Sequence, residues 1–115
     1  MDPHLRLIPA SIGPDGAVED TGREVLLIET ITGSRYLLDM PRERFRRMPA
    51  ADSHDLVIDG EWMPLRGHTR IRIDHRLTLS MGGSDLLTTS HVIRAFRIID
   101  DDSAGLNDDR TETRP

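Results

Sequence analysis

Arginine and histidine are the residue types of this chain that could carry specific chemistry. The chain contains no cysteine. Thiolate chemistry and cysteine-type zinc sites are therefore excluded. Arginine supplies all fifteen basic residues. This is typical of GC-rich genomes, although a planar guanidinium is also the group that binds phosphate or carboxylate in bidentate fashion.

The arginines are densest between residues 42 and 47, and others alternate along the stretch from residue 72 to residue 97. Such groups bind phosphates in nucleic-acid complexes, and aromatic side chains beside them can stack on bases. Trp62 is the only tryptophan and suits either a covered edge or a partner surface. We take the candidate binding residues to be Arg42, Arg46, Arg47, Trp62, Arg72 and Arg76.

The five histidines lack the tight spacing of metal ligands. An acid–base site near Asp74, His75 and His91 is an alternative, but a simple hairpin places these two histidines on opposite faces. The hydroxyl run Thr88-Thr89-Ser90 has no nucleophile motif around it and suits a strand. We therefore expect no catalytic residue, no metal, no cofactor and no enzyme activity.

The net charge of −5 is unevenly distributed. Residues 1–33 and residues 100–115 each hold six acids and two arginines, whereas residues 34–99 hold eleven arginines and eight acids. A body with a charge of +3 thus lies between two ends of −4 each. The two acidic ends are typical of solvated segments. The C-terminal one, residues 100–115, could also compete with an anionic ligand for the basic body.

The elements that must position these residues are strands. Apolar residues alternate with polar ones from Ile71 to Met81, which is the period of a strand with one buried face. Gly82-Gly83 predicts a turn that places Leu79 opposite Leu86. The returning strand, up to Ile99, is apolar at both parities, which predicts a central strand covered on both faces.

A second hairpin is predicted for Glu24–Thr32 and Arg35–Met40. Gly33-Ser34 suits a two-residue turn, which places Ile31 opposite Tyr36 and turns both inward. Leu26, Ile28 and Leu37 fall on the other face and indicate that part of it is also covered.

Pro41–Met48 predicts a short helix, because proline suits the first helical position. Leu56–Ile58 and Glu61–Leu65 flank Asp59-Gly60, which indicates another hairpin. Pro64 cannot donate to a ladder, so this strand should lie at an edge or end there.

The sequence as a whole predicts one all-β domain of residues 24–99, a small antiparallel barrel or sandwich of six to seven strands built from hairpins. Residues 1–23 should be mostly loop, with a short strand at Leu5–Ile8, and residues 100–115 read as a disordered acidic tail.

Three motifs carry a resemblance: S-x-Y-x-x-D at Ser34–Asp39, D-G-x-W at Asp59–Trp62 and T-T-S-x-V-I at Thr88–Ile93. Together they resemble small uncharacterised β-rich proteins of bacteria and their phages. The resemblance spans residues 33–99 and implies a β-rich fold, without catalytic residues.

Two functions follow from these features. The first is a non-enzymatic binding or assembly module with a protein partner or a second copy, because open sheet edges invite association. The alternative is a nucleic-acid or nucleotide-binding regulator that uses an arginine-bearing face. The first residues do not form a secretory signal, and we expect a cytoplasmic or virion-associated protein without a membrane span.

Overall fold

Only β-strands form regular elements in the described part of the chain, which a computed structural model provides for residues 5–19, 22–50 and 60–100. The fold is all-β, as predicted, with eight strands rather than six or seven. No helix of these residues is long and apolar enough to cross a membrane. The strands are β1 (Leu5–Pro9), β2 (Val25–Thr30), β3 (Arg35–Asp39), β4 (Arg44–Met48), β5 (Trp62–Pro64), β6 (Gly67–His68), β7 (Arg76–Gly82) and β8 (Asp85–Asp100).

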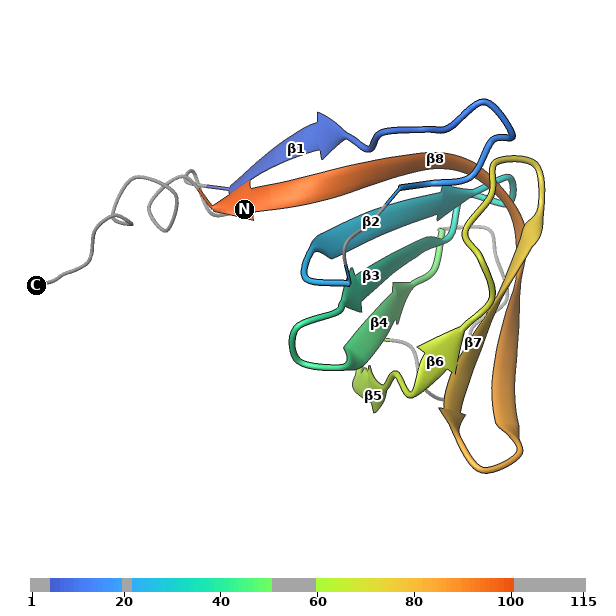
Figure 1. Cartoon of the computed structure of the whole chain (residues 1–115). Coiled ribbons are helices and arrows are strands. Elements are labelled where there is room, and N and C mark those ends of the chain that lie inside the picture. The colour runs from blue at the N-terminus through green and yellow to red at the C-terminus, as the bar shows by residue number, and fades with distance from the viewer. Residues whose placement is uncertain (1–4, 20–21, 51–59, 101–115) are drawn as a thin grey trace, which may run out of the picture.

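One antiparallel sheet curls into a half-barrel in the order β5-β4-β3-β2-β8-β7-β6 (Figure 1). The sixteen-residue strand β8 is its central element, as predicted. The prediction that both of its faces are covered is wrong: Val92 and Ala95 lie in the core, whereas Ile93 is exposed and Phe96 and Ile98 are half-buried. Its first half pairs with β7, and its second half pairs with β2 on one edge and β1 on the other. The predicted strand at Leu5–Ile8 is thus confirmed as part of β1.

The chain between Trp62 and His68 brings the two ends of the curled sheet together. β5 pairs with β4, and β6 pairs with β7. Between them, the Leu65 N–H donates to the Glu43 carbonyl at 2.8 Å and the Arg66 N–H donates to the Ser80 carbonyl at 2.7 Å. β5 is the last strand of the sheet and ends at Pro64, which confirms the edge position predicted from that proline.

The core fills the concave side of the half-barrel. Alternate residues of β2, β3 and β4 point into it, together with Leu77 and Leu79 of β7 and Val92 of β8. Other core members come from the connections: Ala10, Val18, Leu65 and Ile71.

The predicted register of the first hairpin is wrong by three residues. Ile28, not Ile31, lies opposite Tyr36, because the loop runs over residues 31–34 instead of a two-residue turn. Backbone bonds join Thr30 to both Gly33 and Ser34 across this loop, with Gly33 in the left-handed region. An odd shift exchanges the two faces, so Leu26 and Ile28 lie in the core while Ile31 is 66% exposed.

The predicted helix over Pro41–Met48 is also wrong, since residues 44–48 form β4. Pro41 occupies the second position of a turn in which the Glu43 N–H donates to the Met40 carbonyl at 3.1 Å. The alternation that follows buries Phe45 and Arg47 on one face and leaves Arg44 and Arg46 on the other.

The hairpin of β7 and β8 lies where the sequence predicts it, but the pairing of its strands differs from the predicted pairing by one residue. A register shift between Ser80 and Gly82 sets Leu79 opposite Leu87, so Leu86 points outward. The predicted strand at Leu56–Ile58 and the predicted acidic tail beyond Asp100 lie outside the described residues.

Candidate functional site

The outer face of the half-barrel is formed by the side chains that alternate with the core residues. Because paired residues of neighbouring strands point the same way, the register arranges this face in rows. The middle row runs Pro9, Phe96, Leu27, Leu37, Arg46, Trp62. The row on one side runs Leu7, Ile98, Val25, Asp39, Arg44, Pro64, and the row on the other runs Arg94, Glu29, Arg35, Met48.

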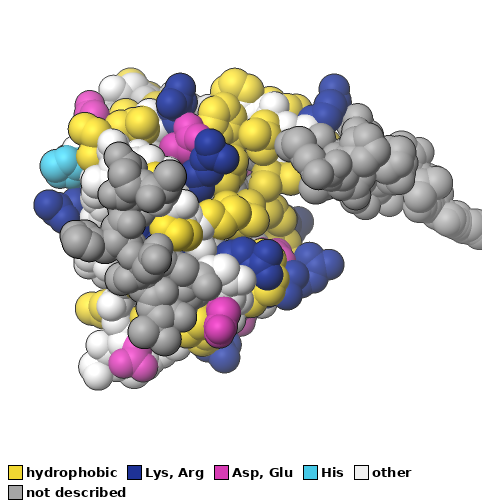
Figure 2. Space-filling model, turned by 180° about the vertical axis from the view of Figure 1, so that it is seen from behind, with side chains coloured by type: hydrophobic (Ala, Val, Ile, Leu, Met, Phe, Trp, Pro, Cys, Tyr) yellow, Lys and Arg dark blue, Asp and Glu magenta, His cyan; other side chains and the backbone are white. Residues whose placement is uncertain are grey.

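Two of these rows carry an apolar strip where an exposed sheet face would ordinarily be polar. We define the apolar strip as Leu7, Val25, Leu27, Leu37, Phe96 and Ile98. Leu7 is 43% exposed, Leu27 is buried beneath its neighbours, and the other members are half-buried. Figure 2 shows hydrophobic side chains gathered over this face between groups of arginine and acidic side chains.

The strip continues into a groove of about 320 Å³ beside the end of β1. Apart from Arg94, its lining is apolar and includes Phe96, Ile73 and Pro9. Ile12 and Ile93, also in the lining, are among the most exposed large apolar residues of the described chain. Strip and groove together form one continuous apolar surface that shares Phe96.

Two clusters of arginine and carboxylate border the strip. In the Glu29 cluster, the Nε atoms of Arg35 and Arg94 lie 3.1 Å and 2.9 Å from the two carboxylate oxygens of Glu29. In the Asp39 cluster, Arg44 Nε and Arg42 Nη1 lie 3.0 Å and 3.4 Å from Asp39 Oδ2.

In each cluster the acid lies beneath its arginines. The Asp39 side chain is 4% exposed and the Glu29 side chain 17% exposed, whereas those of Arg35, Arg42 and Arg94 are more than half exposed. A molecule that approaches this face therefore meets guanidinium groups before it meets a carboxylate.

Trp62 ends the middle row and stacks with two arginines. The guanidinium carbons of Arg44 and Arg46 lie over its ring at 4.0 Å and 4.7 Å from the centroid. Such cation–π contacts hold the arginines in place beside the strip.

The structure separates the six predicted binding residues into three groups. Arg42, Arg46 and Trp62 share the outer face. Arg47 is buried, where its Nε donates to the Tyr36 hydroxyl and its Nη2 to Ser34 Oγ, each at 3.2 Å. Arg72 and Arg76 lie apart from the strip: Arg72 Nη2 donates to the Asp15 carbonyl, and Arg76 sits opposite His91.

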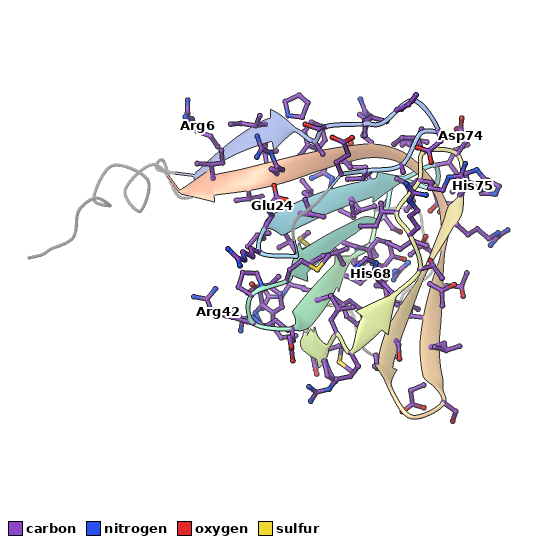
Figure 3. The ribbon with its side chains drawn as sticks, in the orientation of Figure 1. Arg6, Glu24, Arg42, His68, Asp74 and His75 are labelled. Carbon is purple, nitrogen blue, oxygen red and sulfur yellow. The ribbon has the colours of Figure 1, made fainter. Side chains whose placement is uncertain are left out.

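The alternative acid–base group lies at an exposed turn before β7. Figure 3 shows Asp74 and His75 together there, on the opposite side of the molecule from Arg42. Both side chains are exposed, and so is that of His91. In the described residues, no group of three or more histidine and acidic side chains is placed to hold a metal ion.

A second cavity, of about 670 Å³, lies between the loop of residues 13–19 and residues 68–71. Asp15, Glu19, His68 and Arg70 line it. The backbone N–H of Ala17 donates to Asp15 Oδ1 at 3.1 Å and is the main reason that the pKa of Asp15 lies below its usual value; Arg70, at 3.3 Å, adds to this effect. This cavity is open and is lined by apolar as well as polar residues, and Arg70 pairs with Asp15 within it.

Sequence reasoning did not find the apolar strip, because the wrong register of β2 and β3 assigned Val25 and Leu27 to the core face. The available signal was the apolar character of both parities in β2 and in the second half of β8. In a half-barrel, only one of those parities can face the core.

Comparison with protein-family models, with curated proteins and with solved structures finds no match. The resemblance to β-rich proteins of bacteria and phages therefore stays a prediction. One of its motifs, Thr88–Ile93, lies within β8, and another, Ser34–Asp39, consists of Ser34 and the whole of β3.

Proposed function

We propose that this chain is a non-enzymatic binding or assembly module that holds a protein partner against the apolar strip. The observation that carries the proposal is the continuous apolar surface outside the half-barrel, formed by the strip and the adjoining groove. Apolar patches of this kind, bordered by polar groups, mark interaction sites in soluble proteins. Burial of such surface stabilises a complex by about 25 cal/mol per Å² before the costs of association.

The composition of the surface supports a protein partner. Its rim carries arginine and tryptophan, two residue types that recur at the energetically dominant positions of protein interfaces. The strip is built on paired strands rather than on a loop, so little conformational freedom is lost when a partner binds.

The test is selection of peptides from a random library on the immobilised full chain, followed by measurement of their affinities. Leu7 and Ile12 are exposed at 43% and 44%, so the double variant Leu7→Gln/Ile12→Gln removes apolar surface from strip and groove at little cost to folding. The matched control, Ile31→Gln/Leu86→Gln, removes two exposed apolar side chains elsewhere. We expect the strip variant to weaken the selected peptides about tenfold, which is about 1.4 kcal/mol. Selected peptides that respond to the control variant, or to neither variant, would contradict the proposal.

The second candidate, nucleic-acid binding, is favoured by one observation: the stack of Trp62 with Arg44 and Arg46. Against it, Arg47 is buried, and Arg72 and Arg76 lie apart from this face. If this candidate holds, single-stranded oligonucleotides should bind the chain, with a steep loss of affinity as salt rises. Removal of residues 101–115, which carry five acids and two arginines, should then tighten binding. Absence of binding at low salt in fluorescence anisotropy would exclude it.

A further inference from the structure

We infer that the partner of the apolar strip is an acidic segment, in which carboxylates flank apolar side chains. This inference rests on the proposed function and specifies the chemistry of the partner. It follows from the sign, the exposure and the spacing of the charges around the strip.

The outer face has the opposite charge to the whole chain. Its rows and the adjoining β3–β4 turn hold Arg35, Arg42, Arg44, Arg46 and Arg94 against Glu29 and Asp39, which gives +3. The full chain carries −5. The exposed pair Glu43–Arg66, which lies next to the Asp39 cluster, adds no net charge.

The guanidinium groups retain donors for a partner. Arg35, Arg44 and Arg94 each bind their carboxylate through Nε. Within the residues that the structure describes, their terminal nitrogens have no other ion pair. Because Glu29 and Asp39 already hold these side chains in place, a partner carboxylate would bind them with little further loss of side-chain freedom.

The two clusters are spaced to fit one extended segment. Glu29 and Val25 are four residues apart on β2, and Val25 is paired with Asp39. At about 3.3 Å per residue, the two clusters are about 13 Å apart along the strands. The row of Leu27, Leu37 and Phe96 lies between them. A segment with acids at positions i and i+4 and an apolar residue at i+2 would match both clusters and the strip.

A second copy of this chain is a poorer occupant. A two-fold interface places the same patch on both subunits, so the exposed arginines of one outer face would meet those of the other. Like charges that face each other at an interface cost binding free energy, whereas an acidic segment gains it and associates faster.

The probes are three fluorescent twelve-residue peptides that repeat Glu-Ser-Leu-Ser, Gln-Ser-Leu-Ser or Lys-Ser-Leu-Ser. Fluorescence anisotropy with the full chain at low salt should rank them with Glu tightest and Lys weakest. The variant Arg35→Gln/Arg42→Gln leaves Glu29 paired with Arg94 and Asp39 paired with Arg44, so the fold should persist. It should weaken the Glu peptide about fivefold and leave the Gln peptide unchanged.

The matched control is Arg70→Gln/Arg76→Gln, which removes two exposed arginines away from the strip: Arg70 pairs with Asp15, and Arg76 sits opposite His91. It should leave all three peptides unchanged. Equal binding of the Glu and Gln peptides, with both lost on Leu7→Gln/Ile12→Gln, would overturn the acidic partner but keep the proposed function. Peptide binding that Leu7→Gln/Ile12→Gln does not weaken would overturn both the acidic partner and the proposed function. Self-association at the concentrations used, measured by sedimentation, would assign the face to a second copy and also overturn the inference.

Discussion

At the residue scale, Arg47 shows that the type of a side chain does not determine its role. It belongs to the densest arginine run of the sequence, yet β4 turns it inward beneath β3. Its neighbours on the strand, Arg44 and Arg46, point outward to Trp62. One alternation thus divides a single basic run between the core and the surface.

Replacement of Arg47 by alanine should lower the free energy of unfolding by about 2–4 kcal/mol, because it leaves the buried hydroxyls of Ser34 and Tyr36 without their donor and opens a cavity. Arg46→Ala, on the opposite face of the same strand, should cost about 1 kcal/mol or less. Urea denaturation measures both values. Equal losses for the two variants would show that Arg47 is not buried as described.

Asp15 supplies a residue-scale prediction about pH. Its carboxyl has a pKa below the ordinary value of 3.8, mainly because it accepts the backbone N–H of Ala17. A folded-state pKa below the unfolded one gives stability that is fully present above pH 3.8 and is lost as the pH falls through the folded value. Asp15→Asn should therefore be less stable than the natural chain at neutral pH, and the difference should vanish in acid. Thermal melts at several pH values measure it, and a difference that persists at low pH would contradict the assignment.

At the element scale, the connection between β3 and β4 decides whether the arginine run is a helix or a strand. Glu43 adopts a left-handed conformation, with φ at 53°. Only glycine adopts this region without steric cost. In a helix, by contrast, glycine is less favourable than alanine.

A pair of substitutions at residue 43 tests this element. Both Glu43→Gly and Glu43→Ala remove the exposed ion pair with Arg66, so they differ only in backbone preference. We expect the glycine variant to be more stable by about 1 kcal/mol in chemical denaturation. A helix over Pro41–Met48 would make the alanine variant the more stable one, by a similar amount.

Thr89 supports the irregular pairing of β7 with β8. At the register shift between Arg76 and Thr78, the buried Thr89 hydroxyl accepts the Leu77 N–H at 3.1 Å and donates to the Ser90 carbonyl at 2.6 Å. A side chain thus takes the place of a missing ladder bond.

Thr89→Val keeps the shape of this side chain but leaves a buried N–H unpaired, so it should cost about 1–3 kcal/mol of unfolding free energy. Thr89→Ser retains the hydroxyl and should cost less. Guanidinium denaturation of both variants makes the comparison; a serine variant that is as unstable as the valine variant would show that packing, not the hydrogen bond, dominates.

At the scale of the whole molecule, the basic outer face and the acidic chain predict opposite responses to salt for the two possible occupants. Binding of an acidic segment should weaken by about tenfold between low and high salt, because salt screens the exposed guanidinium groups. Self-association through the same face should strengthen, since salt removes the repulsion between like charges. Anisotropy of the Glu-Ser-Leu-Ser peptide and sedimentation of the chain alone, each over a salt series, separate the two. Peptide binding that does not depend on salt would contradict an electrostatic role for the face.

The sequence by itself determined the class of the fold, the central position of β8 and the edge position of β5. These features depend on local chemistry: the period of apolar residues along a strand, apolar residues at both parities, and a proline that cannot donate. Each of them can be inferred from a few neighbouring residues.

Only the tertiary structure decided which face of each strand is the outside, and hence which arginines surround the apolar strip. β2 is apolar at both parities, so local patterning does not choose between Leu26 and Leu27 for the core. The choice depends on the loop at Gly33 and on the closure of the half-barrel, in which Leu65 and Arg66 bond to Glu43 and Ser80. Because a register shift by an odd number exchanges the faces, these distant contacts determine the composition of the candidate site.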